Sequence, residues 1–324
     1  MGMKYHVVTV GSATVDLFAR MTKRFSEPKP GDKVLLDFID IEVGGGGVNP
    51  AIALSRMGLR TAFLGKLGSD HNADEIVRTL VMEGVELLNQ KISKLKTAFS
   101  IILTSKKEAD RILYTYKGAS NDLGYDEVDE RALANTDWIY LATMLGKSFK
   151  TAEKIAQFAK QNGINLLFNT SLYLASMGAS YLSKILEAAS VLILNREEAA
   201  VLLDKRQSTP VRTLLNGLAA LGPRICIVTD GARGVHAFDG GCYYFMKPYR
   251  VKVVSTAGAG DAFNSGLLAG LIRTSSLETA IKVGMANAAS VIKYWGTKNR
   301  LLSWSEALQF IRKHTESVLK TVCQ

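Results

Sequence analysis

The 324-residue sequence is poor in the features that mark secreted, metal-clustered or membrane-spanning proteins. Its three cysteines, Cys226, Cys242 and Cys323, are odd in number and irregularly spaced, so they predict neither a disulfide framework nor a zinc site. No apolar run approaches the roughly 20 residues of a membrane-spanning helix. The N-terminus lacks a long apolar region followed by a small-residue cleavage site. We therefore expect a cytoplasmic protein with no membrane partner.

Long runs of one charge are also missing. The net charge of +10 could attract anionic ligands. The basic residues are scattered, however, and the pair Lys106 and Lys107 is followed at once by Glu108 and Asp110. A lysine-rich surface is the simpler interpretation, and we expect no nucleic-acid partner. The proportions of 47% apolar and 22% charged residues are typical of a globular protein.

Short apolar strands alternate with amphipathic helices along most of the chain, without a fixed-period repeat. We expect one α/β domain over residues 1–324, with a mostly parallel central sheet flanked by helices. Two β-rich stretches, residues 17–43 and 95–120, interrupt the alternation and predict a small β-sheet lid. Strands are predicted at 5–10, 33–43, 61–64, 99–104, 112–116, 138–141, 164–168, 191–194, 225–228, 235–238 and 243–245. Helices are predicted at 49–57, 73–83, 152–161, 181–189, 197–203, 214–221, 261–272, 277–294 and 304–319.

The segment Gly258-Ala259-Gly260-Asp261 carries the most chemical information. A β-rich run enters this small-residue turn, and a helix begins at or near Asp261. Small residues let the backbone approach an anion, and the first amides of a helix are free donors. Phosphoryl transfer requires such a cradle, and an aspartate beside it can accept a hydroxyl proton. Taken alone, the motif could equally be a turn followed by a capped helix.

Four further motifs accompany this segment, each of modest specificity. They are Gly11-Ser12-Ala13-Thr14-Val15-Asp16, Gly44-Gly45-Gly46-Gly47-Val48-Asn49, Asn195-Arg196-Glu197-Glu198 and Thr229-Asp230-Gly231-Ala232-Arg233-Gly234. In this order, over nearly the whole chain, the set resembles the ribokinase, or phosphofructokinase B, family of small-molecule kinases.

The resemblance implies a ribokinase-like fold and transfer of the γ-phosphate of ATP, with Mg²⁺, to a hydroxyl of a sugar or related polyol. A nucleoside kinase of the adenosine kinase type is an alternative acceptor class. A regulator that binds a sugar or nucleotide without catalysis, on the same fold, is the alternative of another kind. The resemblance also allows a homodimer that forms through the lid.

The resemblance assigns roles to residues at the acceptor and the transferring phosphate. Asp261 would be the general base, and the amides of Gly258, Ala259 and Gly260 would form the anion hole. Four residues would bind the substrate: Asp16, Gly44, Gly45 and Asn49. The local alternatives are a turn residue for Asp16 and a helix N-cap for Asn49.

At the nucleotide, the resemblance assigns binding to Asn195, Thr229, Gly231, Gly234 and Asn287. Glu198 would act on Mg²⁺, indirectly. The local alternatives are an exposed charge for Glu198, a hairpin turn at Thr229 and close helix packing around Asn287.

The sequence departs from the family pattern at three places. Ser255 stands where an aspartate helps to hold a monovalent cation in some relatives, which puts potassium activation in doubt. Ala73 replaces a common glycine, which would carry strain if the backbone needed a positive φ there. Met144 and Leu145 stand in the segment where ribokinases have a sugar-binding glutamate, which puts ribose itself in doubt.

A phosphorylated acceptor would need cations on the lid. Four are available: Lys29, Lys33, Arg111 and Lys117. Each could pair with a phosphate, although solvated lid charges are the simpler interpretation.

Overall fold

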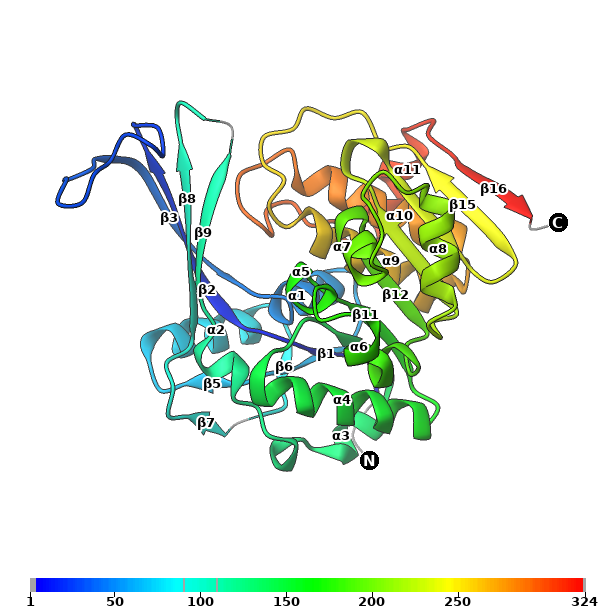
Figure 1. Cartoon of the computed structure of the whole chain (residues 1–324). Coiled ribbons are helices and arrows are strands. Elements are labelled where there is room, and N and C mark those ends of the chain that lie inside the picture. The colour runs from blue at the N-terminus through cyan, green and yellow to red at the C-terminus, as the bar shows by residue number, and fades with distance from the viewer. Residues whose placement is uncertain (1–3, 90, 109, 323–324) are drawn as a thin grey trace.

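The computed structural model describes residues 4–89, 91–108 and 110–322. Most of its strands form one ten-stranded sheet with helices on both faces (Figure 1). In spatial order these strands are β16 (Val318–Val322), β15 (Cys242–Met246), β14 (Val235–Phe238), β13 (Ile225–Thr229), β12 (Val191–Asn195), β11 (Asn165–Asn169), β10 (Thr136–Leu141), β1 (Tyr5–Val10), β4 (Thr61–Leu64) and β6 (Glu86–Leu87). The strands from β13 to β6 are parallel, and β14 to β16 extend the sheet antiparallel.

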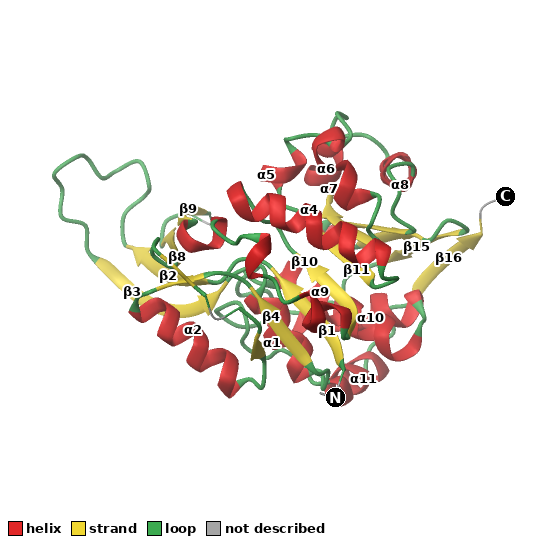
Figure 2. Ribbon diagram, turned by 90° about the horizontal axis from the view of Figure 1, so that it is seen from below, coloured by secondary structure: helices red, strands yellow, loops and turns green. Residues whose placement is uncertain are grey.

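Alternate residues of the strands feed two hydrophobic clusters, one on each face of the sheet. In β1, Val8 and Val10 belong to one cluster and Val7 to the other, as the period of two requires. Figure 2 shows α4 and α8 on one side of the strands and α10 and α11 on the other. The first face carries α3 (Glu130–Ala134), α4 (Gly146–Gln161), α5 (Leu172–Ala175), α6 (Ala179–Leu186), α7 (Arg196–Leu202) and α8 (Val211–Ala219). The second carries α1 (Val48–Arg56), α9 (Ala259–Thr274), α10 (Leu277–Val291) and α11 (Trp304–Arg312).

A separate four-stranded sheet stands to one side of this body (Figure 1). Its strands in spatial order are β3 (Leu36–Gly44), β2 (Thr14–Met21), β8 (Ala98–Ser105) and β9 (Arg111–Tyr116). The helix α2 (His71–Met82) and a pair of short strands, β5 (Leu67–Gly68) and β7 (Ile92–Ser93), complete this side of the molecule. Both predicted β-rich stretches therefore contribute to one small sheet.

The predicted fold class is confirmed, and two local predictions need correction. The helix predicted over 304–319 ends at Arg312, and β16 follows it at the edge of the large sheet. The strand β2, which carries Asp16, is not among the predicted strands because its apolar and polar residues do not alternate regularly. Within the part of the chain that the structure describes, no helix is long and apolar enough to cross a membrane.

Candidate active site

The small-residue loop before α9 is tightly held by a distant segment. Gly258 has φ of 76°, and a Cβ there would lie 2.3 Å from the Thr297 carbonyl oxygen. Only glycine therefore fits this position. Among the described residues, no side chain caps α9, although the Ala259 amide donates to the Thr256 carbonyl over 3.3 Å. The first-turn amides of α9 are therefore free of side-chain acceptors. Ser255 is occupied locally, because its Oγ accepts a hydrogen bond of 3.3 Å from the Ala257 amide.

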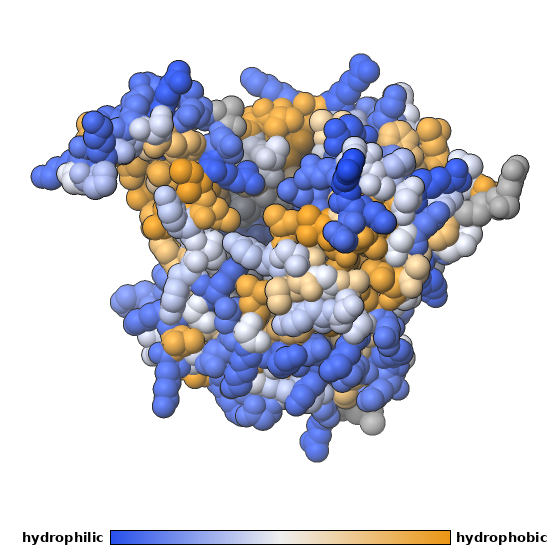
Figure 3. All heavy atoms as spheres, viewed as in Figure 1, coloured by the Kyte–Doolittle hydropathy of each residue, from blue (hydrophilic) through white to orange (hydrophobic). Residues whose placement is uncertain are grey.

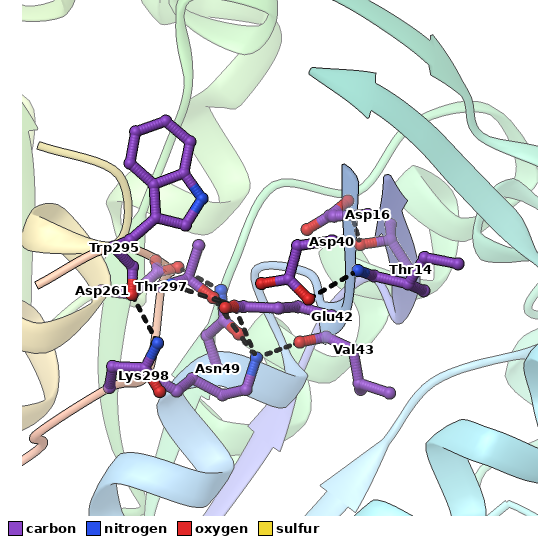
Figure 4. A network of polar contacts seen from close by, with 12 residues as sticks. Thr14, Asp16, Asp40, Glu42, Val43, Asn49, Asp261, Trp295, Thr297 and Lys298 are labelled. Carbon is purple, nitrogen blue, oxygen red and sulfur yellow. Dashed lines mark hydrogen bonds and ion pairs between the residues drawn. The ribbon is translucent and has the colours of Figure 1, made fainter. Parts of the chain in front are cut away.

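Asp261 lies in the first turn of α9 and is joined to Asn49 on α1. The Asn49 Nδ2 donates to Asp261 Oδ2 over 2.9 Å, although 212 residues separate them (Figure 4). Burial raises the pKa of Asp261 above its usual value, against the lowering effect of the Asn49 hydrogen bond. The Asn49 Oδ1 is buried and has no hydrogen-bond partner among the described residues. A buried acceptor of this kind is suited to a ligand hydroxyl.

Asp16 projects from β2 toward the same region (Figure 4). Its Oδ1 accepts a hydrogen bond of 3.0 Å from the Thr14 hydroxyl. Burial raises the pKa of Asp16, against the hydrogen bonds from Thr14 and Ser100. A Cβ at Gly44 would lie 2.1 Å from Asp16 Oδ2, so glycine on the neighbouring strand makes room for the carboxylate. Gly45 has φ of 107°, and a Cβ there would lie 2.4 Å from the carbonyl oxygen of residue 12.

The structure adds a group that the sequence did not reveal. Glu42 on β3 accepts hydrogen bonds of 3.0 Å from the amide and the hydroxyl of Thr297. The Lys298 Nζ lies 3.7 Å from Glu42 Oε2 and also donates to the Val43 carbonyl and the Thr297 hydroxyl. Burial lowers the pKa of Lys298, although Glu42 and Asp16 oppose this shift. Sequence reasoning misses these residues because the segment before Ser303 has neither regular periodicity nor a recognisable motif.

A second region lies at the carboxyl ends of β12 and β13. Asn195 and Thr229 end these adjacent parallel strands and are register partners. They line a recess of about 580 Å³ together with Gly231 and six other residues: Arg196, Glu197, Gln207, Ser208, Asp230 and Arg233. Open α/β sheets place ligands at the carboxyl ends of their strands. Three of the five residues predicted at a nucleotide thus border one recess.

The other two predicted nucleotide residues lie outside that lining. Gly234 has φ of 110°, and a Cβ there would lie 2.2 Å from the Met246 carbonyl oxygen. Asn287 is fully buried on α10. Its Nδ2 donates to the Ala262 carbonyl over 2.8 Å, and its Oδ1 accepts from the Leu302 amide over 2.9 Å. Asn287 therefore fixes α9 to the C-terminal segment and exposes no surface with which to touch a nucleotide.

Glu198 forms a capping box with Asn195 at the start of α7. Asn195 Oδ1 accepts from the Glu198 amide over 2.8 Å, and Glu198 Oε2 accepts from the Asn195 amide over 2.9 Å. Burial raises the pKa of Glu198. Among the described residues, no three His, Cys, Asp or Glu side chains gather to hold a metal ion.

Asp230, which the sequence motif contained without a role, is the best-compensated carboxylate in this recess. It forms ion pairs with Arg196 at 2.8 Å and Arg233 at 2.6 Å. The hydrogen bonds from Arg233 and then Arg196 hold the pKa of Asp230 below its usual value, although burial opposes them.

The other two departures from the family pattern, at Ala73 and at Met144 and Leu145, are explained by their local structure. Ala73 lies in the first turn of α2, where its amide donates to the capping carboxylate of Asp70 over 3.0 Å, and its φ is not positive. Met144 is buried in the core, and Leu145 packs against the same cluster. This wall is apolar because it is part of the core.

Solved structures establish the fold class. The structure matches Arabidopsis thaliana ribokinase complexed with ribose and ATP at a TM-score of 0.83, with 19% identity, covering 96% of this chain and 99% of that one. It matches adenosine kinase from Sinorhizobium meliloti at a TM-score of 0.82, with 23% identity, covering 94% and 99%. The fold is therefore ribokinase-like.

Sequence comparison supplies the family. The profile of the pfkB family carbohydrate kinases matches residues 4–304. The 5-dehydro-2-deoxygluconokinase of Clostridium perfringens is 27% identical, over 97% of this chain and 94% of that protein. The chain belongs to the pfkB family of carbohydrate kinases, and it is a phosphotransferase of the sugar or nucleoside kinase type.

Proposed function

We propose that this kinase transfers the γ-phosphate of ATP to a hydroxyl of a sugar or related polyol, with Asp261 as general base. The observation that carries the proposal is the contact between Asp261 and Asn49, at the start of a helix that has no side-chain cap among the described residues. We name the surroundings of Asp16, Asn49 and Asp261 the acceptor end. The recess lined by Asn195 and Thr229 is the nucleotide end.

The transfer would form a bond between the acceptor oxygen and the γ-phosphorus and break the bond to the bridging oxygen, which leaves with ADP. Asp261 would take the hydroxyl proton, and the amides of Gly258, Ala259 and Gly260 would stabilise the charge on the transferring group. Asp16, Gly44, Gly45 and Asn49 would position the acceptor. The small sheet, as a lid, would exclude water and so favour transfer to the acceptor over hydrolysis.

At the nucleotide end, Asn195, Thr229 and Gly231 would contact the nucleotide. Gly234 and Asn287 would act by fixing the surrounding backbone. Mg²⁺ commonly binds through one or two carboxylates and the substrate phosphates, so the single carboxylate of Glu198 fits an indirect role in holding it. When bound, this ion neutralises charge on the β- and γ-phosphates.

The test is nucleotide consumption with a panel of sugars, sugar acids, sugar phosphates and nucleosides. We expect Asp261→Asn to retain the fold and to lower kcat by about 10²–10⁴-fold, the range for loss of a general base. Burial raises the pKa of Asp261, so on acidification its carboxylate is protonated at a higher pH than an ordinary aspartate. Wild-type kcat/KM should therefore begin to fall, as the pH is lowered, above the usual aspartate range. Unchanged turnover in the folded variant would remove Asp261 from this role.

We also propose that the outer face of the small sheet pairs with a second copy of the chain. Ile39 and Ile41 on β3 are 60% and 61% exposed, and Tyr114 on β9 is 57% exposed. Apolar side chains gather over this sheet in Figure 3. Both β3 and β9 are edge strands with open backbone groups. Light scattering should give a dimer that Ile39→Lys with Ile41→Lys converts to monomer, and a monomeric wild type would retire the proposal.

A further inference from the structure

The segment that follows α10, residues 292–298, packs against the loop that leads into α9. We name this segment the bridge segment and the loop the anion loop. The Val254 amide of the anion loop donates to the Ile292 carbonyl over 2.8 Å. Further along, the Thr297 carbonyl oxygen lies only 2.3 Å from the point where a Cβ at Gly258 would be. Because closely packed interiors transmit displacement, the position of the bridge segment sets the position of the anion loop.

The bridge segment also contacts the small sheet, through Glu42 on β3 (Figure 4). The Glu42 Oε2 accepts hydrogen bonds of 3.0 Å from both the amide and the hydroxyl of Thr297. Gly296 has φ of 96°, and a Cβ there would lie 2.1 Å from the Glu42 Oε1. The Glu42 side chain is only 14% exposed. Both of its carboxylate oxygens therefore face the bridge segment, and glycine at position 296 makes room for them.

Ring contacts and a lysine strengthen the same connection. The Trp295 ring lies edge-on to Phe38 on β3, with centroids 5.4 Å apart, and to Phe18 on β2, with centroids 6.5 Å apart. The Lys298 Nζ donates to the Val43 carbonyl on β3. Beside Trp295, a recess of about 480 Å³ is lined by residues of the small sheet and of the anion loop. The bridge segment therefore attaches the small sheet to the anion loop next to an open space between them.

Resting on the kinase function proposed above, we infer that Glu42 is a positioning residue for phosphoryl transfer. Glu42 binds Thr297, and Thr297 in turn packs against Gly258, so the small sheet sets the geometry of the anion loop. The amides of that loop can stabilise the transferring group only if they are directed at it before the reaction. A displacement of about 1 Å can lower a rate by about 10²-fold. Glu42 itself takes no part in making or breaking bonds.

The kinetic experiment compares Glu42→Ala with Glu42→Gln. Both variants remove the negative charge that pairs with Lys298, but the glutamine side-chain oxygen can still accept the hydrogen bonds from Thr297. We expect Glu42→Ala to lower kcat by about 10- to 100-fold and Glu42→Gln to retain most of it. The KM for ATP should not change, because none of the described residues that line the nucleotide recess belongs to the bridge segment. Equal kcat values in the two variants, or an unchanged kcat in Glu42→Ala, would overturn the inference while leaving the kinase intact.

Asp37 supplies the matched control, because it is a carboxylate on the same strand that binds cations of the small sheet. It accepts hydrogen bonds of 3.1 and 3.2 Å from Arg20 on β2 and pairs with Lys106 after β8. Its side chain is 18% exposed, close to the 14% of Glu42. Asp37→Ala should therefore lower the melting temperature without lowering kcat. A loss of kcat equal to that of Glu42→Ala would show that any weakening of the small sheet has this effect, and would overturn the inference.

Thr297 provides a second pair of variants if Glu42→Ala does not fold. Thr297→Val has the shape of threonine but loses the hydroxyl hydrogen bond to Glu42, whereas Thr297→Ser retains both donors. We expect kcat to fall several-fold in Thr297→Val and to be largely restored in Thr297→Ser, with an unchanged KM for ATP. Equal kcat values in Thr297→Val and wild type would contradict a role of this contact in transfer.

Hydrogen exchange covers the case in which no acceptor is phosphorylated. Measured by mass spectrometry on the intact protein, it reports the local opening of the anion loop without nucleotide or turnover. Peptides over residues 253–263 should exchange several-fold faster in Glu42→Ala than in wild type, and at the wild-type rate in Asp37→Ala. Faster exchange in Glu42→Ala alone would support the connection between the small sheet and the anion loop even if the kinase proposal failed. Exchange at the wild-type rate in folded Glu42→Ala would overturn the inference.

Discussion

The acceptor end and the nucleotide end treat buried charge in opposite ways. At the acceptor end, burial raises the pKa values of Asp16 and Asp261 and lowers that of Lys298. At the nucleotide end, two arginines lower the pKa of Asp230. At the acceptor end, burial has a larger effect on these pKa values than the hydrogen bonds and the Glu42–Lys298 ion pair. At the nucleotide end, the contacts with the two arginines have the larger effect. We infer that a bound ligand would stabilise the buried charges of the acceptor end, whereas Asp230 at the nucleotide end is already stabilised by the protein.

The largest effect is expected at Gly258 of the acceptor end, and a much smaller one at Gly231 of the nucleotide end. Gly258→Ala would place a Cβ 2.3 Å from the Thr297 carbonyl and should lower kcat by about 10²-fold or more, as for loss of preorganised donors. Gly231 also has positive φ, of 53°, but has open space around it. Gly231→Ala should therefore lower stability by only about 1–2 kcal/mol, the intrinsic preference against this backbone region. Steady-state kinetics and thermal melting measure both.

Gly163 supplies a control for the backbone term, because it has φ of 67°, open surroundings and a position beyond α4. Gly163→Ala should match Gly231→Ala in stability and wild type in kcat. If Gly258→Ala behaved in the same way as these two, the close packing of the anion loop would have no catalytic consequence, and the contrast between the two ends would lose its strongest support.

Replacing one aspartate at each end should change stability with opposite sign. Asp230→Asn leaves Arg196 and Arg233 without their shared carboxylate and should destabilise the fold by roughly 1–3 kcal/mol. Asp16→Asn removes a poorly compensated charge and should leave stability unchanged or higher, while it raises KM for the acceptor. Denaturant unfolding of both variants measures the difference.

The pH dependence of these two variants follows from the directions of the pKa shifts. The folded-state pKa of Asp230 is lowered, so its stabilising contribution is present above the unfolded pKa and is lost as pH falls through the folded pKa. The folded-state pKa of Asp16 is raised, so its penalty develops as pH rises through that value. Both variants should therefore approach wild-type stability in acid. Equal destabilisation of both at neutral pH would contradict the comparison.

The sequence predicted the large sheet well because its strands are short apolar runs bounded by helices and turns. It predicted β13 and α9 nearly to the residue, since Val228 ends one apolar run and the glycines before Asp261 mark a helix start. It failed after Arg312, where the predicted helix continued to residue 319, whereas β16 is a short and mostly exposed edge strand. Edge strands are held by their neighbour and carry little signal of their own.

The candidate site was predictable where a role depends on a local motif. Asn195 and Thr229 follow apolar strands, and the sheet rule alone brings them to one edge. The contacts of Glu42 with Thr297 and Lys298 join residues about 255 positions apart, through an irregular segment. At Asn287 the sequence pattern was ambiguous. The pattern could not distinguish a side chain that joins two helices from one that contacts a ligand, and in the structure the Asn287 side chain donates to the Ala262 carbonyl. Contacts between distant irregular segments require the folded structure.

The smallest effect is expected at Glu198, the exception within the nucleotide end. Burial raises its pKa, and no cation among the described residues forms an ion pair with it. Its carboxylate accepts from the Asn195 amide, and the side-chain oxygen of glutamine can accept the same hydrogen bond. Glu198→Gln should therefore change stability by only a few tenths of a kcal/mol, below the loss of a full cap. If Glu198 helps to hold Mg²⁺, the variant should need several-fold more Mg²⁺ for half-maximal rate.

Glu197, which borders the nucleotide recess, provides the comparison, because it is the exposed neighbour of Glu198 in the same helical turn. Glu197→Gln removes the same charge close to the helix N-terminus, so it accounts for the general electrostatic effect on the ion. A greater Mg²⁺ requirement in Glu198→Gln alone would mark Glu198 as a charge kept for a ligand, like those of the acceptor end. An equal requirement in both variants would leave Glu198 as a helix cap, and the nucleotide end would then be internally balanced at both Asp230 and Glu198.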